Sequence, residues 1–117
     1  MLSLPAAVRI FVCRGATDLR RSFDRLSATV TEVLRRDPFS GHLFVFFNRR
    51  KDRVKILVWE RGGFWLLYKR LERGTFAAVD AQELTGRELF LVLEGIEVVR
   101  ERERYERTPE DGKTVHV

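Results

Sequence analysis

Basic and aromatic side chains are interleaved in the middle of this chain. Arg49, Arg50 and Lys51 are consecutive, and further cations and a tyrosine follow them. Arginine and lysine neutralise phosphates, and aromatic rings stack on unpaired bases, so the two residue types together suit nucleic acid better than either type alone. The alternative is a solvated basic surface, with the aromatic rings in the core. The candidate nucleic-acid-binding residues are Arg49, Arg50, Lys51, Arg53, Lys55, Tyr68, Lys69 and Arg70.

Residue patterns typical of enzymes and metal sites are missing from the sequence. His42 and His116 are far apart and have no cysteine partners nearby, so their spacing does not match a zinc site. No glycine-rich phosphate-binding motif occurs. Acidic residues stand mostly beside opposite charges, as in Glu72-Arg73, which is typical of surface ion pairs rather than of a two-metal site. We therefore expect no enzymatic activity, no metal and no cofactor.

The length and charge of the chain limit its class. Its 117 residues predict a single folded domain over residues 1–107, followed by a frayed tail over residues 108–117. Lysine and arginine number 22 against 17 aspartate and glutamate residues, and the resulting net charge of +5 favours an acidic partner.

A single cysteine, Cys13, excludes an internal disulfide and lies in an apolar run, which predicts a buried and inert thiol. The N-terminus lacks the apolar core of a signal peptide, and no segment is long and apolar enough to span a bilayer. We therefore expect a cytoplasmic protein without membrane contact.

Three predicted strands position the basic residues. They cover residues 43–47, 54–58 and 64–71, where apolar residues run together or alternate with other types. Gly62-Gly63 supplies the positive φ angles that a tight hairpin between the second and third strands needs. The first turn spans residues 48–52 and carries the three consecutive cations at its tip.

Alternation along these strands defines two faces. We expect Asn48 to pair with Arg53, and Glu60 with Gly63. One face is then expected to lie on a helix, and it holds Leu43, Val45, Phe47, Val54, Ile56, Val58, Trp65 and Leu67. The other mixes large apolar groups with cations, so we expect either partial cover by the C-terminal segment or an interaction surface. That face holds Phe44, Phe46, Arg53, Lys55, Leu57, Trp59, Phe64, Leu66, Tyr68 and Arg70. A one-residue slip in the second hairpin would bring Trp65 and Lys69 there instead.

Two segments before the meander have periodic patterns. Residues 8–12 are β-branched and aromatic, which predicts a first strand. Apolar residues then recur at helical spacing over residues 18–36, with Thr17 or Asp18 as the N-cap. Asp37-Pro38 ends this predicted helix, because the residue before proline is pushed out of the α region.

After the meander, Thr85 and Glu88 have the spacing of a capping box, and Gly95 is placed to end a second short helix. Residues 98–107 alternate arginine and glutamate and fit an edge strand or an exposed helix. The predicted fold is α+β: a mostly antiparallel three- to four-stranded sheet packs on a long helix, and a second short helix follows the sheet.

Four phrases of the sequence resemble one known family. They are DLRRSFD at 18–24, DPFSGHLFVFFNRRKDRVKIL at 37–57, GGFWLLYKRLERGTF at 62–76, and Leu84-Thr85 followed by LEGIE at 93–97. In this order they look like the small accessory protein of the insertion-sequence sixty-six family, often labelled TnpB, a label shared with an unrelated RNA-guided nuclease. The resemblance covers residues 16–97. The chain departs from the family pattern at Leu19, Arg25, Val58 and Ala77-Ala78.

The resemblance implies a role in DNA transposition. In that family the protein is encoded beside a larger transposase and another small protein, and is needed for transposition without carrying catalytic acidic residues itself. It implies the element-end DNA, the transposase and the other accessory protein as partners, with a second copy of the chain as a further candidate.

Two hypotheses follow for the molecular role. In the first, the basic turn and the adjoining sheet face contact DNA. In the second, aromatic residues dock on the transposase or on a second copy, and the cations form a polar rim. The candidate partner-binding residues are Phe44, Phe46, Trp59 and Phe64. Salt dependence separates the two hypotheses, because only phosphate binding weakens steeply with salt.

Overall fold

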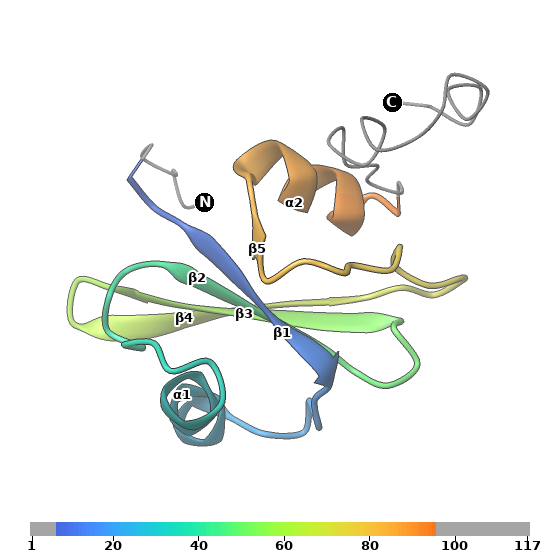
Figure 1. The fold of residues 1–117 in the computed structure, drawn as a ribbon. Coiled ribbons are helices and arrows are strands. Elements are labelled where there is room, and N and C mark those ends of the chain that lie inside the picture. The colour runs from blue at the N-terminus through green and yellow to red at the C-terminus, as the bar shows by residue number, and fades with distance from the viewer. Residues whose placement is uncertain (1–6, 96–117) are drawn as a thin grey trace.

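The computed structural model describes residues 7–95, which form five strands and two helices. Helix α1 (Phe23–Glu32) lies between the first two strands, and helix α2 (Gly86–Leu93) follows the last strand (Figure 1). The strands are β1 (Ile10–Ala16), β2 (Leu43–Phe47), β3 (Arg53–Glu60), β4 (Gly63–Arg70) and β5 (Glu83–Leu84).

All five strands form one mixed sheet in the order β4-β3-β2-β1-β5. Neighbouring strands are antiparallel except β1 and β2, which run parallel because α1 carries the chain back across the sheet between them. The predicted α+β class is therefore confirmed. The predicted strand number is wrong, because β5 has only two residues and leaves no periodic pattern. The prediction also lacked the parallel pair of β1 and β2.

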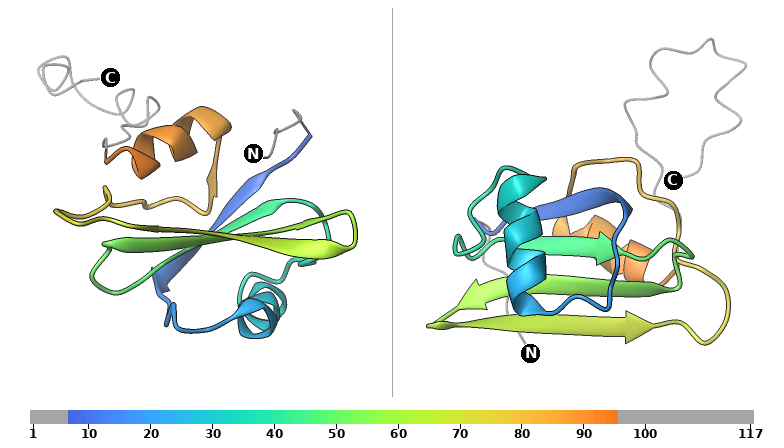
Figure 2. Two further views of the ribbon diagram at one scale, coloured as in Figure 1. Left: turned by 180° about the vertical axis from the view of Figure 1, so that it is seen from behind. Right: turned by 90° about the horizontal axis from the view of Figure 1, so that it is seen from below.

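The sheet is the middle of three layers, with α1 below it and α2 above it in the view of Figure 1. Figure 2 confirms this arrangement from behind. We call the two sides of the sheet the α1 face and the α2 face. On the α1 face the buried residues are Phe11, Cys13, Leu19, Leu26, Val30, Phe44, Phe46 and Leu57. On the α2 face they are Ile10, Val12, Leu43, Val45, Phe47, Val54, Ile56, Val58, Phe76, Leu84, Leu89 and Val92.

Helix α1 is shorter than the helix predicted over residues 18–36. It follows Ser22 as N-cap and ends at Glu32. The carboxylate of Asp18 accepts a hydrogen bond from the backbone N–H of Arg20 at 3.0 Å, and this local bond stabilises a turn in place of the first helical residues. At the other end Arg35 has a φ angle of 56°, which interrupts a right-handed helix.

The helix also packs on the face opposite to the one predicted. Leu26 and Val30 of α1 are buried together with Phe44 and Phe46, whereas the face of Leu43 packs under α2. Phe44 and Phe46 are 0% exposed, so their expected position on an exposed docking surface is wrong. All five residues of β2 are buried, and alternation cannot distinguish the two sides of a strand that is apolar on both.

The register predicted for the meander is confirmed. Glu60 pairs with Gly63, and the backbone N–H of Asn48 donates to the carbonyl of Arg53 at 3.2 Å. The alternative with a slipped second hairpin is therefore excluded.

The β3–β4 turn differs from the prediction in one residue. Arg61 and Gly62 have φ angles of 53° and 84°, so the positive φ angles fall on this pair rather than on Gly62-Gly63. Two successive residues with positive φ are typical of the type I′ turn, whose twist suits a two-residue hairpin.

Helix α2 begins and ends as predicted. The hydroxyl of Thr85 accepts a hydrogen bond from the backbone N–H of Glu88 at 3.1 Å, and the Glu88 carboxylate accepts one from the N–H of Thr85 at 2.9 Å. Gly95 follows the helix with a φ angle of 81°. The Arg-Glu alternation at 98–107 and the predicted tail at 108–117 lie outside the described residues.

At the start of the fold, β1 begins two residues later than the strand predicted over residues 8–12 and continues to Ala16. Gly15, with a φ angle of 91°, lies within an irregularity of the pairing that extends the strand. Cys13 is buried, as predicted. Neither of the two described helices could cross a membrane.

Replacing Phe44 by alanine should destabilise the fold much more than the same change at Phe39. Phe44 is 0% exposed and Phe39 is 54% exposed. The cavity left by Phe44→Ala should reduce the free energy of unfolding by about 3–5 kcal/mol. Phe39→Ala should cost about 1 kcal/mol or less. Denaturant titration measures both, and equal reductions would contradict the burial of Phe44.

Candidate nucleic-acid interface

An open hollow of about 790 Å³ lies where β1 and β2 end. We call it the basic hollow. Its walls come from the β1–α1 segment and the β2–β3 turn, and β3 and β4 contribute residues of the α1 face. One acidic side chain, Asp18, and one aromatic side chain, Tyr68, also line it. The cations that line it are Arg20, Arg21, Arg49, Arg50, Arg53 and Lys55.

The parallel pairing of β1 with β2 brings the two walls together. Ala16 pairs with Phe47, and the backbone N–H of Thr17 donates to the carbonyl of Phe47 at 2.9 Å. The C-terminal ends of both strands lie at the same end of the sheet, on the right of Figure 1. The segment that follows β1 and the turn that follows β2 therefore leave the sheet side by side.

The β2–β3 turn is ordered by its two end residues. The side-chain oxygen of Asn48 accepts hydrogen bonds from the backbone N–H groups of Asp52 at 3.1 Å and Arg53 at 3.0 Å. Its side-chain nitrogen donates to the Asp52 carboxylate at 2.7 Å. This last bond is the main reason that the pKa of Asp52 is lowered, with the positive charges of Arg50 and Arg53 adding to it. The hydrogen bonds within the turn therefore fix the backbone that carries the exposed Arg49 and Arg50.

The opposite wall contains a local ion pair. Nε and Nη2 of Arg20 donate to the two carboxylate oxygens of Asp18 at 3.0 and 2.9 Å. These side-chain bonds, with the backbone N–H of Arg20, lower the pKa of Asp18 to about 2. Asp18 is therefore ionised at neutral pH and offsets part of the charge of Arg20.

Lys55, on strand β3, connects the sheet side of the hollow to this wall. Its Nζ donates to the backbone carbonyl of Arg21 at 3.2 Å and lies 5.1 Å from the centroid of the Tyr68 ring. The distance to the ring is within the range of a cation–π contact. Tyr68 remains 54% exposed, so part of its surface is open to solvent within the hollow.

The structure brings five of the eight predicted nucleic-acid-binding residues to this hollow: Arg49, Arg50, Arg53, Lys55 and Tyr68. Two cations that line it, Arg20 and Arg21, were not predicted. Both lie in the segment that was predicted to be helical, residues 18–36. No pattern near them indicates the Asp18 turn or the parallel strand pair that moves them beside the β2–β3 turn.

Three of the eight lie outside the hollow. The ammonium group of Lys51 is 5.6 Å from the ring centroid of Phe47, on the α2 face. Lys69 also belongs to that side, and its Nζ donates to the carbonyl of Leu93 near the end of α2 at 2.9 Å. Arg70 donates from Nε to the carboxylate of Glu72 at 3.0 Å.

Most cations of the hollow form no ion pair within residues 7–95. In the part of the chain that the structure describes, the ion pairs are Arg9–Glu83, Arg14–Asp80, Arg20–Asp18 and Arg70–Glu72. None of these includes Arg21, Arg49, Arg50, Arg53 or Lys55. Five charges are therefore available to an anionic ligand, and they lie on adjoining segments of the chain.

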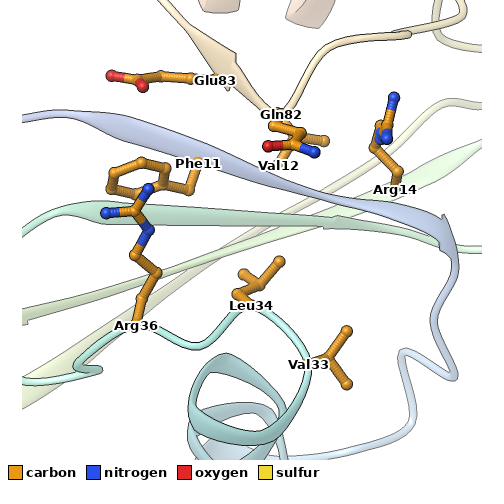
Figure 3. Close-up of a pocket in the computed structure, with 8 residues that line it drawn as sticks. All are labelled: Phe11, Val12, Arg14, Val33, Leu34, Arg36, Gln82 and Glu83. Atoms are coloured by element: carbon orange, nitrogen blue, oxygen red, sulfur yellow. The ribbon is translucent and has the colours of Figure 1, made fainter.

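A second hollow, of about 370 Å³, lies between β1, β5 and the segment after α1 (Figure 3). Here the guanidinium carbon of Arg36 is 4.0 Å from the ring centroid of Phe11. The carboxylate of Glu83 accepts two hydrogen bonds from Arg9 at 2.8 Å, and these lower the pKa of Glu83. The charged groups around this hollow are engaged within the protein, so it is a weaker candidate for an anion than the basic hollow.

Four aromatic rings form a partly exposed group that we call the aromatic patch: Phe23, Phe39, Trp59 and Phe64. The rings of Trp59 and Phe64 are 5.0 Å apart between centroids, and Phe39 contacts both. Phe23 and Phe39 are 42% and 54% exposed, whereas Trp59 and Phe64 are half-buried. Two of the four predicted partner-binding residues therefore lie in this patch.

Histidine, cysteine and acidic side chains do not cluster into a group of three or more anywhere in residues 7–95. This part of the chain therefore offers no set of side chains of the kind that holds a structural metal ion.

Comparison with known proteins places the chain in a family. A family model described as IS66 Orf2 like protein matches residues 8–103. Uncharacterized protein y4hO of Sinorhizobium fredii (strain NBRC 101917 / NGR234) is 40% identical over 83 residues, which are 70% of this chain and 71% of that protein. Uncharacterized protein y4jC of the same organism is 37% identical over 76 residues, 65% of each chain. No solved structure matches. The family match covers most of the sequence and confirms the resemblance carried by its four phrases, so the chain belongs to the IS66 Orf2-like family.

Proposed function

We propose that this protein is a non-catalytic accessory factor of DNA transposition that contacts DNA through the basic hollow. Membership of the IS66 Orf2-like family implies the accessory role in transposition. The proposed DNA contact rests on one observation. A single hollow is lined by the exposed ring of Tyr68 and by five cations that form no ion pair in the described part of the chain. Charge of this kind suits the phosphates of a nucleic-acid backbone.

The geometry of the hollow favours an extended anion over a small one. Its volume of about 790 Å³ is open to solvent, and its cations come from separate segments of the chain. Several phosphates spaced along a strand could be neutralised together, each by a different arginine. We propose element-end DNA in the cytoplasm as the ligand, with the transposase and the other accessory protein in the same assembly.

Replacing Arg49, Arg50 and Arg53 together by glutamine should weaken DNA binding without unfolding the protein. All three side chains are exposed, so the stability change should be within about 0.5 kcal/mol for each site. The plot of log affinity against log salt should become shallower by about 0.9 for each duplex phosphate that is no longer neutralised. Affinity should fall for all DNA sequences alike, and fluorescence anisotropy over a salt series measures both effects.

The matched control removes three arginines elsewhere, in the variant Arg35→Asn, Arg61→Asn, Arg87→Gln. All three are exposed, and asparagine tolerates the positive φ angles at 35 and 61. The net charge falls equally in both triple variants, but only the first removes charge from the hollow. Equal reductions of affinity and slope in the two variants would reject the hollow as the site.

Asp18→Asn should strengthen DNA binding. The asparagine carbonyl can still accept the N–H of Arg20, whereas the negative charge that offsets this arginine is gone. If Arg20 then contacts a duplex phosphate, the salt slope should steepen by up to about 0.9. Adding Arg20→Gln should cancel the gain. An unchanged affinity in Asp18→Asn would show that this wall of the hollow does not meet DNA.

The aromatic patch supports a second candidate function, docking on the transposase without direct DNA contact. Phe23 and Phe39 expose apolar surface beside half-buried Trp59 and Phe64, as the anchors of a protein interface do.

Replacing Phe39 by serine should then reduce retention of the transposase in a pull-down with the full-length protein. Phe90→Ser is the control, because Phe90 is 61% exposed but lies on α2, across the sheet from the patch. Retention by docking should depend weakly on salt, unlike phosphate binding. Equal retention of the transposase by the two variants would count against the patch.

A further inference from the structure

Strand β4 lies at one edge of the sheet formed by residues 7–95. It spans eight residues and pairs with β3 in an unbroken register. In residues 7–95 no strand lies on its other side, and Figure 2 shows it as the outermost strand in the view from below. An edge of this length presents a row of backbone donors and acceptors to solvent.

The features that normally protect such an edge are scarce in β4. Edge strands are usually short, bulged, interrupted by proline or studded with charge, and β5 at the opposite edge has only two residues. β4 has neither a proline nor a bulge, and its two charges, Lys69 and Arg70, stand together at its end. Trp65 and Tyr68 are 51% and 54% exposed, so large side chains as well as backbone groups face solvent here.

The pairing with β3 determines which backbone groups point outward. Gly63 faces Glu60 across the two-residue turn, and the N–H of Leu71 donates to the carbonyl of Asp52 at 2.7 Å. Odd-numbered residues of β4 therefore bond to β3, because hydrogen-bonded and non-hydrogen-bonded positions alternate along an antiparallel pair. The outward backbone groups belong to Phe64, Leu66, Tyr68 and Arg70.

We propose that β4 pairs antiparallel with β4 of a second copy of the chain, around a two-fold axis at Leu67. This register places Lys69 opposite Trp65 of the partner subunit, and Arg70 opposite Phe64 of the partner subunit. Each cation faces an aromatic ring, on the α2 face in the first pair and on the α1 face in the second.

The choice of a second copy as occupant rests on the order of residues along β4. Phe64 and Trp65 lie near its start and both of its cations at its end, so the strand is complementary to its own reverse. A two-fold interface requires this kind of self-complementarity. Parallel pairing in register would bring Lys69 and Arg70 against the same charges of the partner subunit, which is unfavourable.

The pairing has a consequence for the basic hollow. A two-fold axis within an antiparallel pair is perpendicular to the sheet, so both α1 faces turn to the same side of one continuous sheet. Two basic hollows then open on a single surface. This consequence rests on the proposed function, whereas the pairing of β4 does not depend on it.

Two measurements on the full-length protein test the pairing. Analytical ultracentrifugation should give a mass twice the 13.7 kDa of one chain. Leu67→Cys should form a covalent dimer under oxidised glutathione, because residues facing each other at a non-hydrogen-bonded position have Cα atoms about 4.5 Å apart, within disulfide range. Lys69→Cys alone should not cross-link, but should do so when mixed with Trp65→Cys. The buried Cys13 of the unmodified chain provides the blank.

A backbone variant gives an independent test. Leu66→Pro removes an outward N–H and leaves the bonds to β3 in place, whereas Leu66→Ala removes the same side chain and keeps the N–H. Relative to Leu66→Ala, the proline variant should raise the dimer dissociation constant about tenfold or more. Cross-linking of Lys69→Cys as efficient as that of Leu67→Cys would overturn the register. A chain that is monomeric at every concentration would overturn the pairing, and DNA binding by that monomer would leave the proposed function intact.

Discussion

The parallel pairing of β1 with β2 is the constraint on which the candidate site depends. Parallel neighbours end at the same edge of a sheet, so the segments that leave them emerge together. Here those segments are the Asp18 turn and the basic β2–β3 turn, which are about thirty residues apart in the sequence. An antiparallel arrangement of the two strands would place them at opposite ends of the sheet, and the basic hollow would not form.

The sheet can support an exposed, charged site because both of its faces are already covered. Every residue of β2 is buried, with α1 closing one side and α2 with its preceding segment closing the other. The apolar burial that stabilises the fold is thus separate from the hollow, whose cations contribute little to it. Substitutions in the hollow and in the core should therefore affect binding and stability separately.

Family membership indicates the cellular process, whereas the geometry of the hollow bears on the molecular contact that the chain could make. The family places the chain in transposition, and its named relatives are themselves uncharacterized. The hollow indicates which chemistry the chain could contribute, namely neutralisation of phosphates by arginines that form no ion pair within residues 7–95. The aromatic patch adjoins the edge strand β4, since Phe64 belongs to both, and both are candidates for protein contacts.

Local patterns in the sequence determined the local structure. The meander register, the Thr85–Glu88 capping box and the burial of Cys13 depend on residues close in sequence or on simple apolarity, and all three were predicted correctly. Five residues that line the hollow are among the predicted nucleic-acid-binding residues, because they lie on one turn and the hairpin that follows it, and their contact with DNA stays a prediction. How distant segments meet depended on long-range packing: the parallel strand pair, the face that α1 covers, and the place of Arg20 and Arg21. A strand that is apolar on both sides carries no signal for which side a helix will cover, and a turn held by one aspartate looks helical by periodicity.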